Sequence, residues 1–226
     1  MKDIGNRYEI SSLTNDKVKL INSLHHRKYR REHNLFVAEG IRICREAAEN
    51  GWEIRYLLYD NLNIDTHLIE NLINDVLCLG ADVIGVTSEI LSKISHKENP
   101  QNVLCVIDQK WSNLPTIIKD KTFVALETVR DPGNLGTILR TMDGVGATDC
   151  ILLDECTDPF SYESVRASMG AIFNVNIIAS SSEKFLKWKS RHKISLIGTS
   201  LINSNDYTKT NWQLPFVLAM GNEQQG

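Results

Sequence analysis

Two polar side chains, Asn134 and Arg140, lie in a stretch where packing does not explain them. Residues 123–126 form a short apolar run typical of a buried strand, and a polar turn with a proline and a glycine follows. Apolar residues then recur at the spacing of one helix face: Leu135, Ile138, Leu139, Met142 and Val145. Asn134 and Arg140 lie off this stripe. Asn134 either caps the helix or contributes to a site at the carboxyl edge of a parallel sheet.

Two later stretches favour a site. Residues 158–173 read Asp-Pro-Phe-Ser-Tyr-Glu-Ser-Val-Arg-Ala-Ser-Met-Gly-Ala-Ile-Phe, and residues 216–226 read Phe-Val-Leu-Ala-Met-Gly-Asn-Glu-Gln-Gln-Gly. Together, and in this order, the three stretches resemble the motifs of the SpoU (TrmH-type) family of RNA ribose 2′-O-methyltransferases, in the SPOUT superfamily. The resemblance implies methyl transfer from S-adenosyl-L-methionine (AdoMet) to a ribose 2′-hydroxyl of RNA. Ribosomal RNA is the expected substrate, with transfer RNA as the alternative.

The resemblance also implies which residues form the site. Asn134, Arg140 and Glu223 match catalytic positions of the family. Two turns that follow predicted strands match its cofactor loops and supply Thr199, Ser200, Gly221 and Asn222. Leu218, in the last predicted strand, is a further cofactor-binding candidate. Glycine-containing turns let backbone groups approach a ligand closely, although such turns are also common as plain structural features.

Arg140 has two interpretations within this resemblance. In the family the matching arginine is assigned as the base that accepts the hydroxyl proton, whereas a guanidinium is effectively always protonated in proteins. The alternative is that Arg140 holds the phosphate beside the target ribose while Asn134 orients Arg140 or the hydroxyl. Glu223 would then fix its loop by accepting hydrogen bonds.

The carboxyl end departs from the family pattern. The family normally continues for a few dozen residues past the position of Glu223, completing the cofactor pocket, a deep trefoil knot and much of a homodimer interface. Gln224 also stands where the family has glycine. We therefore expect an incomplete knot, and a non-catalytic RNA-binding protein is the alternative function. A dehydrogenase or kinase is disfavoured, because Gly144 and Gly146 follow a helix and no Gly-x-x-x-x-Gly-Lys occurs.

A basic segment near the amino end could contact RNA. Tyr29 could stack on a base of the RNA. The cations around it could bind phosphates; they are Arg27, Lys28, Arg30 and Arg31. Arg166 in the second motif is a further candidate for RNA binding. The alternative for all of them is a solvated helix surface, which is the commoner fate of a charge run.

The elements that would position these residues divide the chain into two α/β domains. We expect residues 1–108 to form a substrate-binding domain that resembles the ribosomal-protein L30e fold, residues 109–120 a linker, and residues 121–226 the methyltransferase domain. The second domain should be a three-layer parallel βαβαβαβ sandwich. In the substrate-binding domain, helices are expected at residues 12–26 (capped by Thr14), 41–48, 65–72 and 87–94. Its strands are expected at residues 35–38, 54–59, 76–79 and 103–107.

Composition fits a single globular chain of 226 residues with 42% hydrophobic and 23% charged residues. The net charge of −3 argues against non-specific coating of nucleic acid, although local clustering decides whether an RNA site exists. The five cysteines form no Cys-x-x-Cys pair and the six histidines show no metal-ligand spacing, so no metal is expected. Without a signal-peptide pattern or a membrane-length apolar run, a cytoplasmic protein is expected, with no membrane partner.

Overall fold

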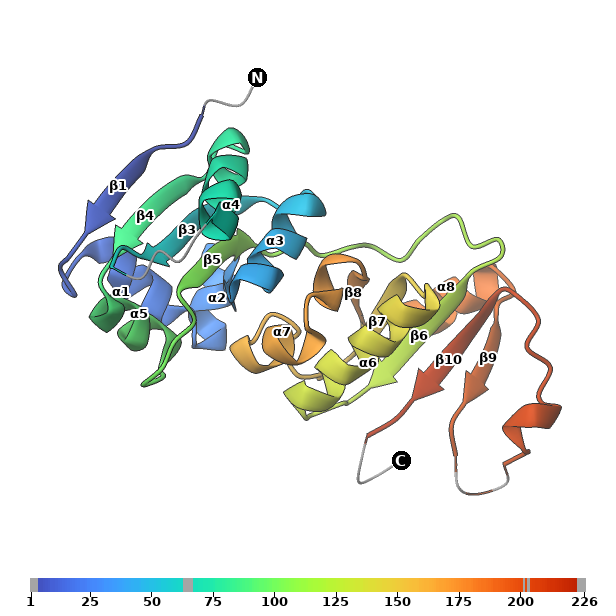
Figure 1. Cartoon of the computed structure of the whole chain (residues 1–226). Helices are drawn as coiled ribbons and strands as arrows, with labels where there is room; N and C mark the ends of the chain where they lie inside the picture. Colours follow the sequence, from blue (N-terminus) through green and yellow to red (C-terminus); the bar gives the residue numbers. More distant parts are fainter. Residues whose placement is uncertain (1–3, 63–66, 201, 203, 223–226) are drawn as a thin grey trace.

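The computed structural model describes residues 4–62, 67–200, 202 and 204–222. Within them the chain forms two α/β units, each built on a five-stranded sheet (Figure 1). The strands of the first unit are β1 (Arg7–Ile10), β2 (Leu35–Glu39), β3 (Ile54–Asp60), β4 (Asp82–Val86) and β5 (Val103–Asp108). Its helices are α1 (Asp16–Ser23), α2 (Arg27–His33), α3 (Ile41–Glu49), α4 (His67–Cys78) and α5 (Ser88–Ser95).

The first sheet is mixed and has the strand order β1-β4-β3-β5-β2. Strands β1, β4 and β3 run parallel, whereas β5 is antiparallel to both β3 and β2. Because side chains alternate along a strand, one face of the sheet packs against α1 and α5 and the other against α3 and α4. Neighbouring residues Phe36 and Val37 of β2, for example, belong to different core clusters.

The second unit follows the predicted βα alternation. Its strands are β6 (Thr122–Glu127), β7 (Asp149–Leu153), β8 (Asn176–Ser180), β9 (Ser195–Gly198) and β10 (Phe216–Met220). Its helices are α6 (Pro132–Val145), α7 (Tyr162–Ser168) and α8 (Ser182–Arg191), with short 3-10 helices η1 (Ala171–Phe173) and η2 (Tyr207–Lys209). All five strands are parallel, which confirms the predicted parallel α/β sheet.

The strand order of this sheet is β8-β7-β6-β10-β9. Strands β7 and β8 extend to one side of β6, and the last strand, β10, is inserted between β6 and β9. Helices α6 and α7 cover one face, while Phe185 and Trp188 of α8 pack on the other, against Phe123 and Ile151. The strand order therefore reverses beside β6, as at the ligand-binding position of many open α/β sheets. The trefoil knot stays a prediction.

Apolar and polar contacts join the two units. Phe36 and Trp52 of the first unit share a core cluster with Phe160 and Phe173 of the second, and Trp52 Nε1 donates to the Phe173 carbonyl at 3.0 Å. The connecting segment is also packed: the Ser112 backbone N–H donates to the Ile177 carbonyl at 2.8 Å, beside β8. The stretch expected to be a linker thus follows the edge of the second sheet.

Three predictions for the first unit were wrong. Residues 76–79 were predicted as a strand, but α4 extends to Cys78 and the strand is β4; β1 was not predicted at all. The helix expected at 12–26 ends at Ser23, and its cap is Asn15 instead of Thr14. The physical reason for the first error is that Val76 continues one helix face, and a short apolar run fits a strand equally well. The buried residues of that face are Ile69, Leu72, Ile73 and Val76.

The described residues contain neither a membrane-spanning helix nor a metal-binding cluster. No helix there is both long and apolar enough to span a bilayer. The same residues include no cluster of three or more His, Cys, Asp or Glu side chains that could hold a metal ion.

Candidate functional site

The carboxyl ends of β9, β10 and β6 meet at one edge of the second sheet. Gly198 of β9 lies opposite Ala219 of β10, and β10 pairs with β6 on its other side. Two hydrogen bonds connect the turns that follow: the Thr199 backbone N–H donates to the Ala219 carbonyl at 3.0 Å, and Asn222 Nδ2 donates to the Thr128 carbonyl at 2.9 Å. This edge coincides with the reversal of strand order.

A cleft of about 700 Å³ opens beside this edge. Thr199, Ser200 and Leu218, three of the cofactor residues implied by the resemblance, line it together. Gly221 and Asn222 occupy the turn directly after β10. The volume lies within the range of small-molecule sites. The structure thus brings these five residues to the ends of two neighbouring strands.

The other wall of the cleft comes from the segment between β9 and β10, which sequence reasoning did not single out. The Asp206 carboxylate accepts hydrogen bonds from the Thr208 hydroxyl at 2.7 Å and the Thr208 backbone N–H at 2.9 Å, and these bonds lower the pKa of Asp206. Trp212 Nε1 donates to the Tyr207 carbonyl at 3.0 Å. An aspartate two residues before a threonine is a turn signal that could have identified this segment.

Helix α6 starts at the same edge, and its cap is Asp131. The Asp131 carboxylate accepts from the Asn134 backbone N–H at 2.7 Å. The interpretation of Asn134 as the cap is therefore wrong, because Pro132 occupies the first helical position and leaves Asp131 as the residue before the helix. The start of α6 does not depend on the Asn134 side chain, which is exposed in the first turn.

Arg140 lies on the exposed side of α6, about 9 Å of helical rise beyond Asn134. Within the described part of the chain its guanidinium makes no hydrogen bond or ion pair. The opposite side of α6 is buried, and a Cβ at Gly136 would lie 2.5 Å from Ala167 Cβ of α7. Neither Asn134 nor Arg140 is among the residues that line the 700 Å³ cleft. Glu223 lies outside the described residues.

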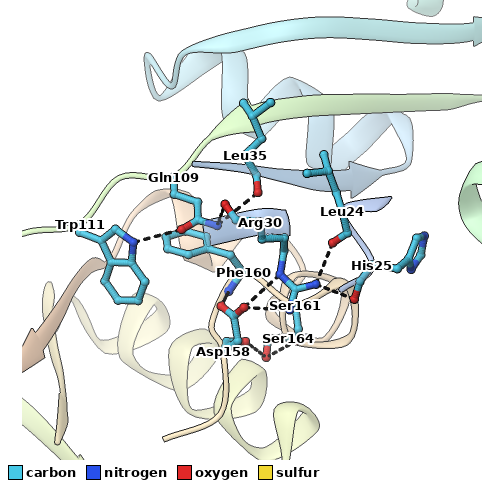
Figure 2. A network of polar contacts seen from close by, with 10 residues as sticks. All are labelled: Leu24, His25, Arg30, Leu35, Gln109, Trp111, Asp158, Phe160, Ser161 and Ser164. Carbon is cyan, nitrogen blue, oxygen red and sulfur yellow. Dashed lines mark hydrogen bonds and ion pairs between the residues drawn. The ribbon is translucent and has the colours of Figure 1, made fainter. Parts of the chain in front are cut away.

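The second motif forms α7 and the loop before it. In that loop Asp158 is buried, and its Oδ2 accepts two hydrogen bonds from Arg30 of the first unit, from Nη2 at 2.8 Å and Nε at 3.0 Å (Figure 2). Arg30 Nη1 also donates to the carbonyls of Leu24 and His25, each at 2.7 Å. The second carboxylate oxygen accepts from the Phe160 backbone N–H at 2.9 Å. The pair therefore fastens α2 to the second motif.

The burial of Arg30 contradicts its expected contact with RNA. Its side chain is 5% exposed and is held inside the junction of the two units. The other three cations of the basic segment, and Arg166 on α7, are exposed. The physical reason is that five consecutive residues of a helix surround its axis, so one of them must face inward. Nothing in the local sequence distinguishes Arg30 from its neighbours.

Four of the five cysteines are buried, and Cys78 is exposed. Burial raises the pKa of the Cys105, Cys150 and Cys156 thiols. These thiols therefore stay protonated at neutral pH, which does not suit a nucleophile.

Comparison with protein families matches both parts of the chain. Residues 15–105 match the MRM3-like substrate binding domain, and residues 121–226 match the SpoU rRNA Methylase family. Among individual sequences, a 23S rRNA (guanosine-2′-O)-methyltransferase of Bacillus subtilis is 27% identical over 218 residues, which cover 96% of this chain and 84% of that protein.

Solved structures resemble the whole fold. The crystal structure of an rRNA methyltransferase from Sinorhizobium meliloti is 40% identical, with a TM-score of 0.90 over 98% of this chain and 84% of that one. The SpoU methyltransferase AviRb from Streptomyces viridochromogenes, solved in complex with AdoMet, is 26% identical, with a TM-score of 0.86 over 94% of this chain and 83% of that one. These likenesses extend over both sheets, and together with the family match they establish that this chain belongs to the SpoU family of RNA methylases.

Proposed function

We propose that the chain transfers a methyl group from AdoMet to a ribose 2′-hydroxyl of ribosomal RNA. The observation that carries the proposal is the meeting of three loops where the strand order of the second sheet reverses, joined by the 2.9 Å hydrogen bond from Asn222 to Thr128. The relatives support both substrates, because the Sinorhizobium meliloti protein is an rRNA methyltransferase and AviRb was solved with AdoMet. A cytoplasmic location stays a prediction.

The 700 Å³ cleft fits AdoMet in size and in chemistry. Trp212 and Leu218 offer apolar surface for an adenine ring, while the hydroxyls of Thr199 and Ser200 offer hydrogen bonds to a ribose or to the amino-acid part. Bound AdoMet supplies a methyl group on a positively charged sulfur. The contribution of Gly221 and Asn222 would be to close the turn over the cofactor.

Asn134 and Arg140 would act on the RNA. A guanidinium stays protonated at physiological pH, so Arg140 holds the phosphate beside the target ribose and does not serve as the base. Asn134 orients the attacking hydroxyl from the first turn of α6. Such alignment can contribute up to roughly 7–11 kcal/mol in ideal cases. Glu223 keeps its proposed role as the acceptor that fixes the last loop.

The exposed cations would bind the RNA backbone at a distance from the reacting ribose. Arg27, Lys28 and Arg31 present three positive charges on α2, and Tyr29 is exposed among them. Arg166 adds a fourth charge on α7. Phosphate contacts of this kind supply affinity and register. Because the whole chain has a net charge of −3, attraction of RNA has to come from this local cluster of cations.

A homodimer is part of the proposal. Strand β9 is an edge strand, and Leu196 and Leu214 leave apolar surface exposed on and beside the β9–β10 edge of the sheet. A second copy of the chain would cover such a surface. Light scattering after size-exclusion chromatography tests this, and a monomer at micromolar concentration would contradict it.

The enzyme assay is direct. The chain is incubated with unmethylated ribosomal RNA and radiolabelled AdoMet, and the RNA is digested to nucleosides. We expect label on 2′-O-methyl nucleosides, and a rate about 100-fold lower for Arg140→Ala, in the range found when a positioned electrostatic group is removed. Arg191→Ala, at the exposed end of α8, is the matched control.

Methylation of a base, or an unchanged rate for Arg140→Ala, would contradict the proposed mechanism. Calorimetry with AdoMet tests the alternative function. RNA binding without saturable AdoMet binding would identify a non-catalytic RNA-binding protein.

A further inference from the structure

A second cavity, of about 300 Å³, lies between the two units. One wall comes from the end of β2 and the start of α3, and the other comes from α7. Arg42 belongs to the first wall and Arg166 to the second, and Lys97 and Gln101, before β5, also line the cavity. We call this cavity the inter-unit groove. Apart from Arg166, its side chains were not among the candidate site residues.

The charges of the inter-unit groove favour an anion. Its carboxylate, Glu39, is buried and already bound by Lys97 Nζ at 2.8 Å and by the Gln101 backbone N–H at 2.7 Å. Arg42 and Arg166 are both exposed, and neither makes a side-chain hydrogen bond or ion pair within the described residues. The groove therefore keeps two uncompensated positive charges, one from each unit, and suits an anionic ligand that spans the junction.

The rest of the groove is lined by apolar side chains and by Tyr162. Ile41 and Val165 line it, and Met169 holds a left-handed backbone angle (φ 53°) with a side chain that is 45% exposed. The Tyr162 hydroxyl is buried without a hydrogen-bond partner among the described residues. Buried polar groups normally find a partner. Because this hydroxyl has almost no accessible surface, the apolar wall is the feature that suits the face of a planar base better than a bare phosphate.

We propose that the inter-unit groove binds one unpaired nucleotide of the RNA substrate. The base would lie against Met169 and Tyr162, and the flanking phosphates would bind Arg42 and Arg166. The inference rests on the RNA substrate proposed above and adds a contact made by both units. An unpaired nucleotide is required because base edges in an RNA duplex are largely out of reach, whereas single strands can splay a base into a pocket.

The test uses a fluorescein-labelled single-stranded RNA of about ten nucleotides, a typical single-strand site size, titrated with the full chain at several salt concentrations. We expect Arg42→Ala to weaken binding about tenfold, since a charged hydrogen bond is lost. The slope of log K against log salt should become shallower by about 0.7 for one lost phosphate contact. Arg45→Ala changes a cation of the same helix that does not line the groove, and it should bind as the wild type does.

A second variant tests the proposed contact between Met169 and the base. Met169→Ser should weaken binding of the intact oligonucleotide by about fivefold through lost apolar contact, and should not affect an oligonucleotide made of abasic sites. Equal affinity and equal salt slope for wild type and Arg42→Ala would overturn the inference, as would equal effects of Met169→Ser on both oligonucleotides.

AdoMet binding and methyl transfer by the wild type distinguish the two proposals. If the wild type methylates ribosomal RNA while Arg42→Ala and Met169→Ser bind RNA normally, the groove inference fails and the proposed function stands. If the wild type binds RNA through the groove without methyl transfer, the proposed function fails and the groove inference stands.

Discussion

Thr128 has a backbone angle that its side chain disfavours. It lies directly after β6 with φ 53°, in the left-handed region that β-branched residues rarely adopt. Its carbonyl accepts the Asn222 hydrogen bond that joins the turns at the candidate site. Left-handed backbone costs about 1–2 kcal/mol for a residue other than glycine. Strain of this kind is concentrated at functional sites, which is consistent with the position of Thr128.

Thr128→Gly should raise the free energy of unfolding by about 1 kcal/mol, because glycine adopts this angle without strain. It should also slow methyl transfer, because the loop that leads into α6 would be less constrained. Urea denaturation and the methylation assay measure the two effects. Lys193→Gly relieves a similar angle (φ 54°) after α8 and should stabilise the chain without slowing the reaction. A faster Thr128→Gly enzyme would contradict this account.

His25 is a titratable group at the junction of the two units. Its ring stacks on His96 at 3.8 Å between centroids, and its Nε2 lies 2.5 Å from the Ile94 carbonyl, so Nε2 carries the proton. Burial lowers the pKa of His25, and the neighbouring His96 lowers it further, against the raising effect of the hydrogen bond to Ile94. The folded protein therefore holds His25 neutral more strongly than the unfolded chain does.

The direction of the pH effect follows. Because the pKa is lower in the folded state, the unfolded chain binds the proton more readily, so the contribution of His25 is complete above the unfolded pKa of about 6.5. This contribution to stability is lost as the pH falls from the unfolded pKa through the lower pKa of the folded state. His25→Gln should therefore show a smaller loss of stability between about pH 7 and pH 5 than the wild type, measured by urea denaturation. An unchanged slope for His25→Gln would contradict this account.

Helices α6 and α7 pack unusually closely at Gly136. A Cβ there would lie 2.5 Å from Ala167 Cβ and 2.8 Å from the Ser164 carbonyl oxygen, so the neighbouring helix would have to move. Both helices carry candidate site residues, Arg140 on α6 and Arg166 on α7. The close approach therefore sets the position of one motif relative to the other.

Gly136→Ala should destabilise the chain by about 1–3 kcal/mol, the usual effect of overpacking, although alanine is the better helix former. Gly144→Ala is a matched control in the same helix, since nothing lies within 4 Å of its added Cβ. That variant should be stabilised by about 0.5–1 kcal/mol. Thermal unfolding followed by circular dichroism measures both. A stabilised Gly136→Ala protein would contradict this prediction, because it would show that α6 and α7 can move apart without losing stability.

The two units form one connected molecule instead of two domains on a loose tether. Arg30 and Asp158 are 128 residues apart in the chain, yet they form a buried ion pair in the junction, which the shared aromatic core also joins. A buried charge left without its partner is strongly unfavourable. The pair therefore ties the folding of α2 to that of the loop before α7.

Asp158→Ala should lower the free energy of unfolding by about 3–5 kcal/mol, because it leaves the Arg30 cation buried without its carboxylate. The two units should then unfold in separate steps, seen as non-coincident transitions by tryptophan fluorescence and circular dichroism. Glu155→Ala removes an exposed carboxylate 3.6 Å from Arg130 and should change stability by less than about 1 kcal/mol. A single transition with wild-type stability for Asp158→Ala would contradict the coupling.

Much of the second unit could be predicted from local sequence. The strand before Asn134, the helix after it and the last strand all follow from periodicity. The motifs also indicated the family. These features depend on residues a few positions apart, whose geometry the backbone period sets directly.

Other features depended on which elements pack against each other. Arg30 belonged to a run of cations, and only the approach of the second unit showed that it is buried against Asp158. The insertion of β10 between β6 and β9, and the pairing of Arg42 with Arg166 in one groove, likewise join residues far apart in the chain. Periodicity shows that a side chain faces a neighbour, but it does not show which neighbour. Burial and charge pairing are settled only when distant segments meet.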